Sequence, residues 1–124
     1  MADRFTTTAV RSYSSGTNGR CISSARTNHF VIDDADYSGG PNEAITAAEA
    51  FLSGLTACAV LMVERLAREA EVPLKWMDVS LEASRDREVV HDVHSVYDRV
   101  RMRFELRGPS EAEAKDLVEK YQQR

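Results

Sequence analysis

AAEAFLSGLTACAVLMVERLA, residues 47 to 67, is the stretch that decides the fold. Thr46 and Glu49 just before and inside it have the T-x-x-E spacing of a capping box, and Pro73 follows its end. The pattern predicts one long helix over about residues 43–71, with a broad buried face that includes Cys58. Residues of this face recur at three- and four-residue spacing: Ala48, Phe51, Leu52, Leu55, Cys58, Ala59, Met62, Val63 and Leu66.

Residues 4–34, ahead of this helix, have the composition of short strands. The segments RFTTTAVRSY and RCISSAR are rich in β-branched residues and flank SSGTNG, whose Asn18-Gly19 pair favours the positive φ angles of a hairpin turn. The segment NHFVIDD is typical of a third strand. Gly39, Gly40 and Pro41 then end the strand block.

Residues 74–107 predict a two-stranded hairpin. Met77, Val79, Leu81 and Ala83 alternate with polar residues, and the second strand has the same alternation. Its core-facing residues are expected to be Val96, Val100, Met102, Phe104 and Leu106. Its other face carries Arg99, Arg101, Arg103 and Arg107. We interpret this arginine stripe as an ion-paired solvent face, with an anion-binding surface as the alternative.

The last helix is predicted over residues 110–123. Ser110 and Glu113 form a second capping box, and Ala114, Leu117 and Val118 lie on one face. Strands and helices therefore segregate along the chain instead of alternating, which predicts a single α+β domain over residues 1–124 with antiparallel sheet. A chain of 124 residues has only a modest core as a monomer, so a core shared within a dimer would help it.

Composition excludes several classes of function. Sixteen Lys and Arg against twenty Asp and Glu give a net charge of −4, which disfavours nucleic acid and anionic membranes as partners. The longest apolar run is shorter than a bilayer span and the N-terminus lacks a signal sequence, so a cytoplasmic protein is expected. Cys21 and Cys58 form no zinc spacing with His29, His91 or His94, so we expect reduced thiols, no metal and no cofactor.

Two segments carry a resemblance to a known family. AEAFLSGLTAC resembles a helix of the form E-L-L-L-A-A-L-x-x-C, and VYDRVRMRFELRG with the last helix resembles the second half of the same proteins. The chain resembles the OsmC/Ohr family of osmotically inducible and organic hydroperoxide resistance proteins. The resemblance implies an intertwined homodimer, with antiparallel sheets wrapped around central long helices and an active site at the interface.

The resemblance also implies thiol peroxidase chemistry. Cys58 would be the peroxidatic nucleophile, and an external dithiol would reduce the oxidised enzyme. The activating Arg of the family falls at Thr17 here, whereas Arg20 matches the later Arg of the same turn. The resolving cysteine of the family opens a C-P motif where this chain ends, at EKYQQR. Cys21 is then either a strand-packing residue or a replacement resolving thiol.

Glu49 has two interpretations. It precedes Cys58 by nine residues, about 13 Å of helical rise, so the two side chains of one straight helix do not meet. Glu49 is therefore a capping residue, or a catalytic residue that steers the Arg after a helix break near Ser53-Gly54 or across a dimer. The candidate site is Cys58, Arg20 and Glu49. The resemblance implies an organic hydroperoxide reductase, and the alternative expectation is a redox-inactive dimer that binds a small hydrophobic ligand in the interface pocket.

Overall fold

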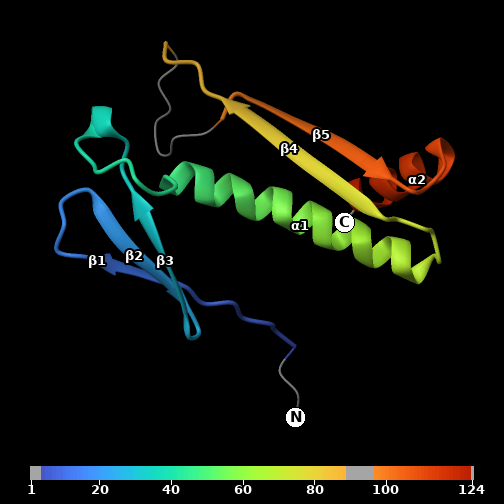
Figure 1. The fold of residues 1–124 in the computed structure, drawn as a ribbon, viewed down its shortest axis with the longest axis horizontal. Helices are drawn as coiled ribbons and strands as arrows, with labels where there is room; N and C mark the ends of the chain where they lie inside the picture. Colours follow the sequence, from blue (N-terminus) through green and yellow to red (C-terminus); the bar gives the residue numbers. More distant parts are fainter. Residues whose placement is uncertain (1–3, 89–96, 124) are drawn as a thin grey trace. The chain divides into compact units, whose positions relative to one another are not determined.

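The computed structural model describes residues 4–88 and 97–123 (Figure 1). It has two antiparallel sheets and a long helix, which confirms the predicted α+β class. The elements are β1 (Arg11–Ser14), β2 (Arg20–Ala25), β3 (Asn28–Asp33), a 3-10 turn (Asp36–Ser38), α1 (Ala47–Glu69), β4 (Trp76–Ser84), β5 (Arg99–Arg107) and α2 (Glu111–Gln122). The chain forms two compact units, Met1–Phe51 and Leu52–Arg124. The predictions for His91, His94 and Val96 lie outside the described residues.

The N-terminal unit contains the sheet β1-β2-β3, in which both pairings are antiparallel. The first strand is much shorter than predicted. Arg11 pairs with Ser24, and β2 ends one residue later, at Ala25. The residues before Arg11 therefore have only one further β2 residue with which to extend the ladder. Gly19 has the positive φ expected of the first turn, at 77°, and an added Cβ there would meet Gly40 Cα at 2.6 Å.

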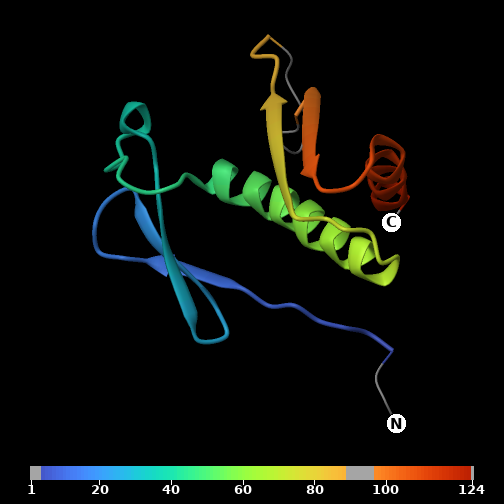
Figure 2. The same cartoon turned by 45° about the vertical axis from the view of Figure 1, so that its right-hand side comes forward.

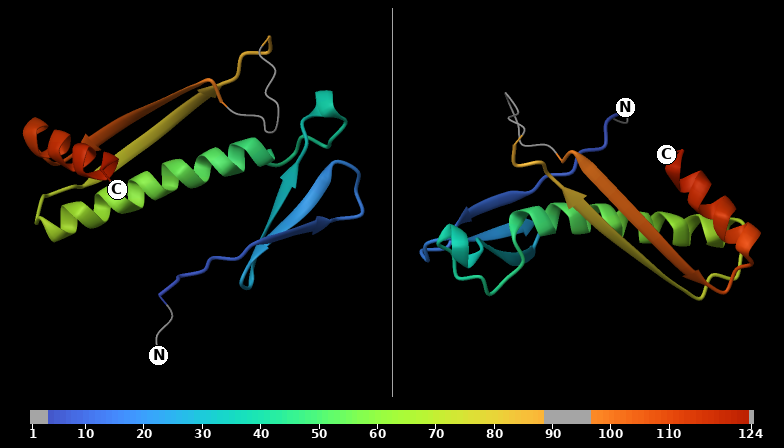
Figure 3. Two further views of the ribbon diagram at one scale, coloured as in Figure 1. Left: turned by 180° about the vertical axis from the view of Figure 1, so that it is seen from behind. Right: turned by 90° about the horizontal axis from the view of Figure 1, so that it is seen from above.

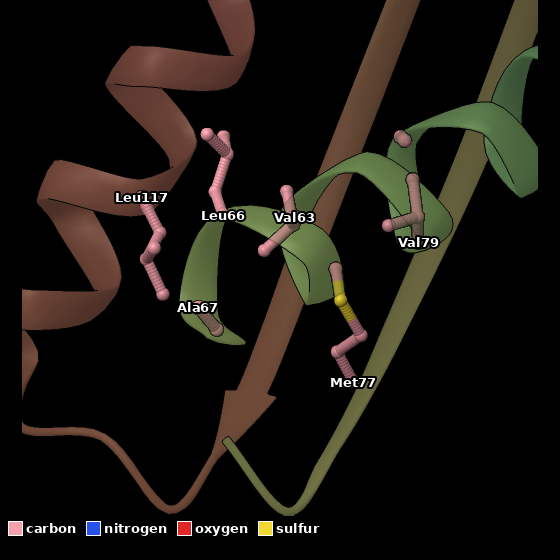
Figure 4. Close-up of a cluster of buried hydrophobic side chains, with 7 residues drawn as sticks. Val63, Leu66, Ala67, Met77, Val79 and Leu117 are labelled. Atoms are coloured by element: carbon pink, nitrogen blue, oxygen red, sulfur yellow. The ribbon is translucent and has the colours of Figure 1, made fainter. Parts of the chain in front are cut away.

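The C-terminal unit packs the β4–β5 hairpin and α2 against α1 (Figures 2 and 3). Figure 4 shows the side chains that join these elements: Val63, Leu66 and Ala67 of α1, Met77 and Val79 of β4, and Leu117 of α2. Val63 and Leu117 are 0% and 1% exposed. The predicted inward faces of β4 and α2 are therefore confirmed.

The hairpin differs from expectation next to its connecting loop and along its arginine stripe. Val100 is 54% exposed instead of facing the core. It pairs with Ala83, one residue from the Ser84–Arg99 end of the hairpin where the connecting loop begins, beyond the core residues of β4. Opposite charges face each other at Glu82 and Arg101, whereas Arg107 lies 4.7 Å over the Trp76 ring. Among the described residues, the ion pair of the stripe joins Arg107 Nη2 to Glu105 Oε1 of the same strand at 3.6 Å, and the cation–π contact of Arg107 with Trp76 adds to it.

Helix α1 begins at Ala47, later than the predicted start at about residue 43, but directly after the predicted capping box. Thr46 N donates to Glu49 Oε1 at 2.9 Å, and Glu49 N donates to Thr46 Oγ1 at 3.2 Å. These are the two reciprocal bonds of a capping box. The helix then runs without interruption through Ser53 and Gly54, so the break considered from the sequence does not occur.

The buried face of α1 is narrower than predicted. Its buried residues are Ala59, Val63, Leu66 and Ala67. Cys58 is exposed, which makes the prediction of its burial wrong. At 100° per residue, Cys58 lies about a third of a turn from the middle of the buried stripe, which packs with Met77 and Val79 of β4 and Leu117 of α2.

Helix α1 also passes a length-and-composition test for a membrane span, with a mean hydropathy of 1.6 over its most apolar window. The estimate that its apolar run falls short of a span is wrong on this measure. Small residues such as Gly54 and Ala57 extend the weakly apolar stretch without adding charge. The core helix of a soluble protein passes the same test.

Candidate functional site

Cys58 lies on an exposed apolar stripe of α1. Leu55, Cys58 and Met62 recur at three- and four-residue spacing, and Leu61 lies beside them. Leu55 is 44% and Leu61 60% exposed, so apolar side chains surround an accessible thiol. The sulfur of Cys58 is not part of a disulfide, because Cys21 and Cys58 are both free thiols. A thiol in this setting can meet a substrate with an apolar body.

Arg20 forms a two-pronged ion pair within the N-terminal unit. Its Nε donates to Asp33 Oδ1 at 2.7 Å and its Nη2 donates to Asp33 Oδ2 at 2.8 Å. Glu43 Oε1 lies 3.7 Å from Nη2. The geometry follows from the β2–β3 register, which places Arg20 opposite Asp33. Nη1 makes no hydrogen bond to another described residue, so the guanidinium can still donate to a second anion.

Asp33 joins the sheet to the loop that leads to α1. Its side chain is fully buried, and Oδ2 also accepts a bond of 3.0 Å from Glu43 N. The Arg20 guanidinium, and then the backbone N–H groups of Glu43 and Ala44, hold the pKa of the Asp33 carboxyl below its usual value. The same pair raises the pKa of Arg20. Arg20 therefore remains charged, oriented and bound to its own carboxylate.

We expect this ion pair to make the stability of the fold sensitive to acid. A carboxyl with a lowered folded pKa contributes stability above its unfolded pKa of about 4, and this contribution disappears as the pH falls through the folded pKa. The thermal midpoint should therefore fall steeply below about pH 4. Asp33→Asn should be less stable at pH 7 and flatter with pH, whereas Asp34→Asn should keep the wild-type profile. An unchanged acid profile in Asp33→Asn would contradict this assignment.

Glu49 acts at the start of α1. The backbone N–H of Thr46 is the main reason why the pKa of the Glu49 carboxyl is lowered. The two capping-box hydrogen bonds explain the position of the Glu49 side chain. This agrees with the first interpretation from the sequence, in which Glu49 is a capping residue.

The other residues singled out from the sequence lie in the N-terminal sheet. Cys21 is half-buried on β2, opposite Ser14 and Ile32. Thr17 lies in the β1–β2 turn, where its carbonyl accepts a 3.2 Å bond from Arg20 N. His29 Nδ1 lies 2.7 Å from Ser24 Oγ.

Sequence reasoning missed Asp33, which it treated only as part of a strand. The sequence of the β2–β3 hairpin contains a signal for the pairing of Asp33 with Arg20. A two-residue turn at Arg26-Thr27 places position 20 opposite position 33, and an acid opposite an arginine across two strands is a recognised stabilising pair. The partner of Arg20 could therefore have been found from the register.

Comparison with known proteins places this arrangement in a family. A family model described as OsmC-like protein matches residues 40–124, which is more than half of the chain, so the chain belongs to the OsmC-like family. Its fold is similar to the crystal structure of an OsmC-like protein from Mycoplasma pneumoniae, with a TM-score of 0.82 at 16% identity over 96% of this chain and 82% of that chain. A search of curated proteins gives no match.

A second solved structure is an organic hydroperoxide resistance protein OsmC from Legionella pneumophila. Its TM-score is 0.68 at 19% identity, over 98% of this chain and 85% of that chain. OsmC-like proteins are typically homodimers and their fold is that of a soluble domain. Helix α1 is accordingly interpreted as the core helix of such a domain.

Proposed function

We propose that the protein is a cytoplasmic, homodimeric peroxidase that reduces organic hydroperoxides with Cys58 as its nucleophile. The single observation that carries the proposal is the exposed Cys58 thiol among apolar residues of α1, in a chain that belongs to the OsmC-like family. Leu55 and Leu61 are exposed on the same helix. A second copy of the chain would cover such residues and give the thiol an apolar wall.

The proposed reaction is a two-electron reduction of the O–O bond. The Cys58 thiolate attacks one oxygen of R–O–O–H and forms Cys–S–OH, while the other oxygen leaves as an alkoxide and takes a proton to become the alcohol. An external dithiol then attacks the sulfenic acid, releases water and leaves as a disulfide after its second thiol displaces Cys58.

Arg20 is the proposed activator of the thiolate. A nucleophilic thiol needs positive charge nearby, because apolar surroundings alone keep it protonated. Arg20 is the first residue of β2, directly after the β1–β2 turn, and its Nη1 remains available while Asp33 holds the rest of the guanidinium. Glu49 is proposed to act on this group only indirectly, by fixing the start of α1.

The substrate preference tests the proposal. Burial of each CH₂ group contributes about 0.8 kcal/mol, so a substrate with a bulky apolar body should gain at least about tenfold over one without it. With a dithiol as reductant, we expect kcat/KM for cumene hydroperoxide to exceed that for hydrogen peroxide by at least about tenfold. Equal values would contradict the role of the apolar stripe. Binding of an apolar dye without any turnover would favour the alternative, a redox-inactive dimer that binds a hydrophobic ligand.

A further inference from the structure

The N-terminal sheet carries a group of cationic side chains to which the peroxidase mechanism assigns no role. Arg11 of β1 pairs with Ser24 of β2, and Ser24 pairs with His29 of β3. Residues directly opposite each other in an antiparallel sheet point to the same face, so these three form one row across the sheet. Arg26 follows Ser24 by two residues, in the turn between β2 and β3. A cavity of about 280 Å³ is lined by this row together with Val10, Tyr13 and Arg26.

Arg26 has an unusual backbone conformation for its residue type. Its φ is +57°, in the left-handed region that glycine and asparagine occupy at lower cost. Left-handed non-glycine residues cost of the order of 1 kcal/mol and cluster at sites that bind ligands. Arg26 thus lines the cavity at a position where glycine would make the turn at lower cost.

The charges of this cavity have no acidic partners in the part of the chain that the structure describes. No carboxylate there forms an ion pair with Arg11 or Arg26, although the chain has four more acidic than basic residues. Arg11 lies 4.7 Å over the Tyr13 ring. Stacking uses the flat face of a guanidinium and leaves its N–H edge available to an anion.

His29 adds a third polar group to the cavity. Ser24, which is only 7% exposed, lies with its hydroxyl 2.7 Å from His29 Nδ1. This contact orients the imidazole and leaves Nε2 without a hydrogen bond to the described residues. Two guanidinium groups and an oriented imidazole beside the Tyr13 ring match an anion attached to an apolar body.

We propose that this cavity binds a small organic anion, whose carboxylate or phosphate group contacts Arg11, Arg26 and His29 and whose apolar body packs on Tyr13 and Val10. The site lies wholly in the N-terminal unit and does not depend on the reactivity of Cys58. Charge-assisted hydrogen bonds supply the affinity, so a neutral ligand of the same shape should bind much more weakly.

Calorimetric titration of the full chain with benzoate, phenyl phosphate and neutral benzamide tests the proposal. We expect at least one of the two anions to bind about tenfold or more tightly than benzamide. Binding of both anions supports a general oxyanion site, and binding of one supports the same site with a narrower preference. The proposal is overturned if neither anion binds, or if benzamide binds as tightly as the anions.

Three variants assign the binding to this cavity. Arg26→Gly removes the guanidinium but suits the positive φ, so the fold should be retained with an equal or higher thermal midpoint. We expect Arg26→Gly and Arg11→Gln each to weaken binding of the anion by about tenfold. Arg65→Gln, a charge change on an exposed residue of α1, should leave the affinity unchanged. Unchanged affinity in Arg26→Gly, or an equal loss in Arg65→Gln, would overturn the assignment.

Discussion

A Cys58→Ser variant is expected to reduce cumene hydroperoxide at least about a hundredfold more slowly than the wild-type protein, with the same dithiol as reductant. A serine hydroxyl stays protonated at neutral pH and cannot accept an oxygen atom to form a sulfenic acid. The side chain is exposed on α1, so the substitution should leave the fold and the thermal midpoint unchanged. Steady-state consumption of the hydroperoxide measures the effect.

Cys21→Ser is the matched control, since it removes the other thiol of the chain. If Cys21 only packs in β2, this variant should keep wild-type turnover. Loss of activity in Cys21→Ser would identify it as a resolving thiol, which was the second interpretation of this residue from the sequence. Wild-type activity in Cys58→Ser would instead remove the basis of the proposed mechanism.

Gly108→Ala is expected to lower the free energy of unfolding by about 3 kcal/mol or more. Gly108 connects β5 to α2 with a φ of +113°, and an added Cβ would collide with the Pro73 carbonyl oxygen and lie 2.9 Å from Lys75 N. The collision would displace the loop in which Lys75 N donates to Arg107 O at 2.8 Å. Denaturation by urea measures the loss.

Gly16→Ala separates the collision from the backbone strain. Gly16 has a φ of +97°, but an added Cβ would have no neighbour within 4 Å. This variant should therefore lose only about 1 kcal/mol, which is the cost of a left-handed alanine alone. Equal losses in the two variants would show that the close approach of residues 73–75 to Gly108 does not contribute to stability.

Local signals in the sequence predict most of the elements. The capping boxes at Thr46-Glu49 and Ser110-Glu113 fix the starts of α1 and α2, and both are formed in the structure. The alternation of β4 places Met77 and Val79 in the core, as observed. These features depend on neighbours within a few residues, which is why they can be read directly from the chain.

Side-chain burial and pairing are harder to predict, because they depend on distant parts of the chain. The periodicity of α1 shows that Cys58 and Val63 are both on an apolar side, but only the packing of β4 and α2 decides that Val63 is covered and Cys58 is not. The buried partner of Arg20 likewise depends on the β2–β3 register. The sequence therefore identifies the thiol and the arginine as candidates without showing their surroundings.

The central claim is that Cys58 is a peroxidatic thiol, and intact-mass analysis after one equivalent of cumene hydroperoxide tests it most directly. The reaction is run with a sulfenic-acid trap on the wild-type, Cys21→Ser and Cys58→Ser proteins. We predict rapid formation of one trapped adduct per chain in the first two proteins and none in Cys58→Ser. A wild-type Cys58 that remains unmodified under these conditions would contradict the account.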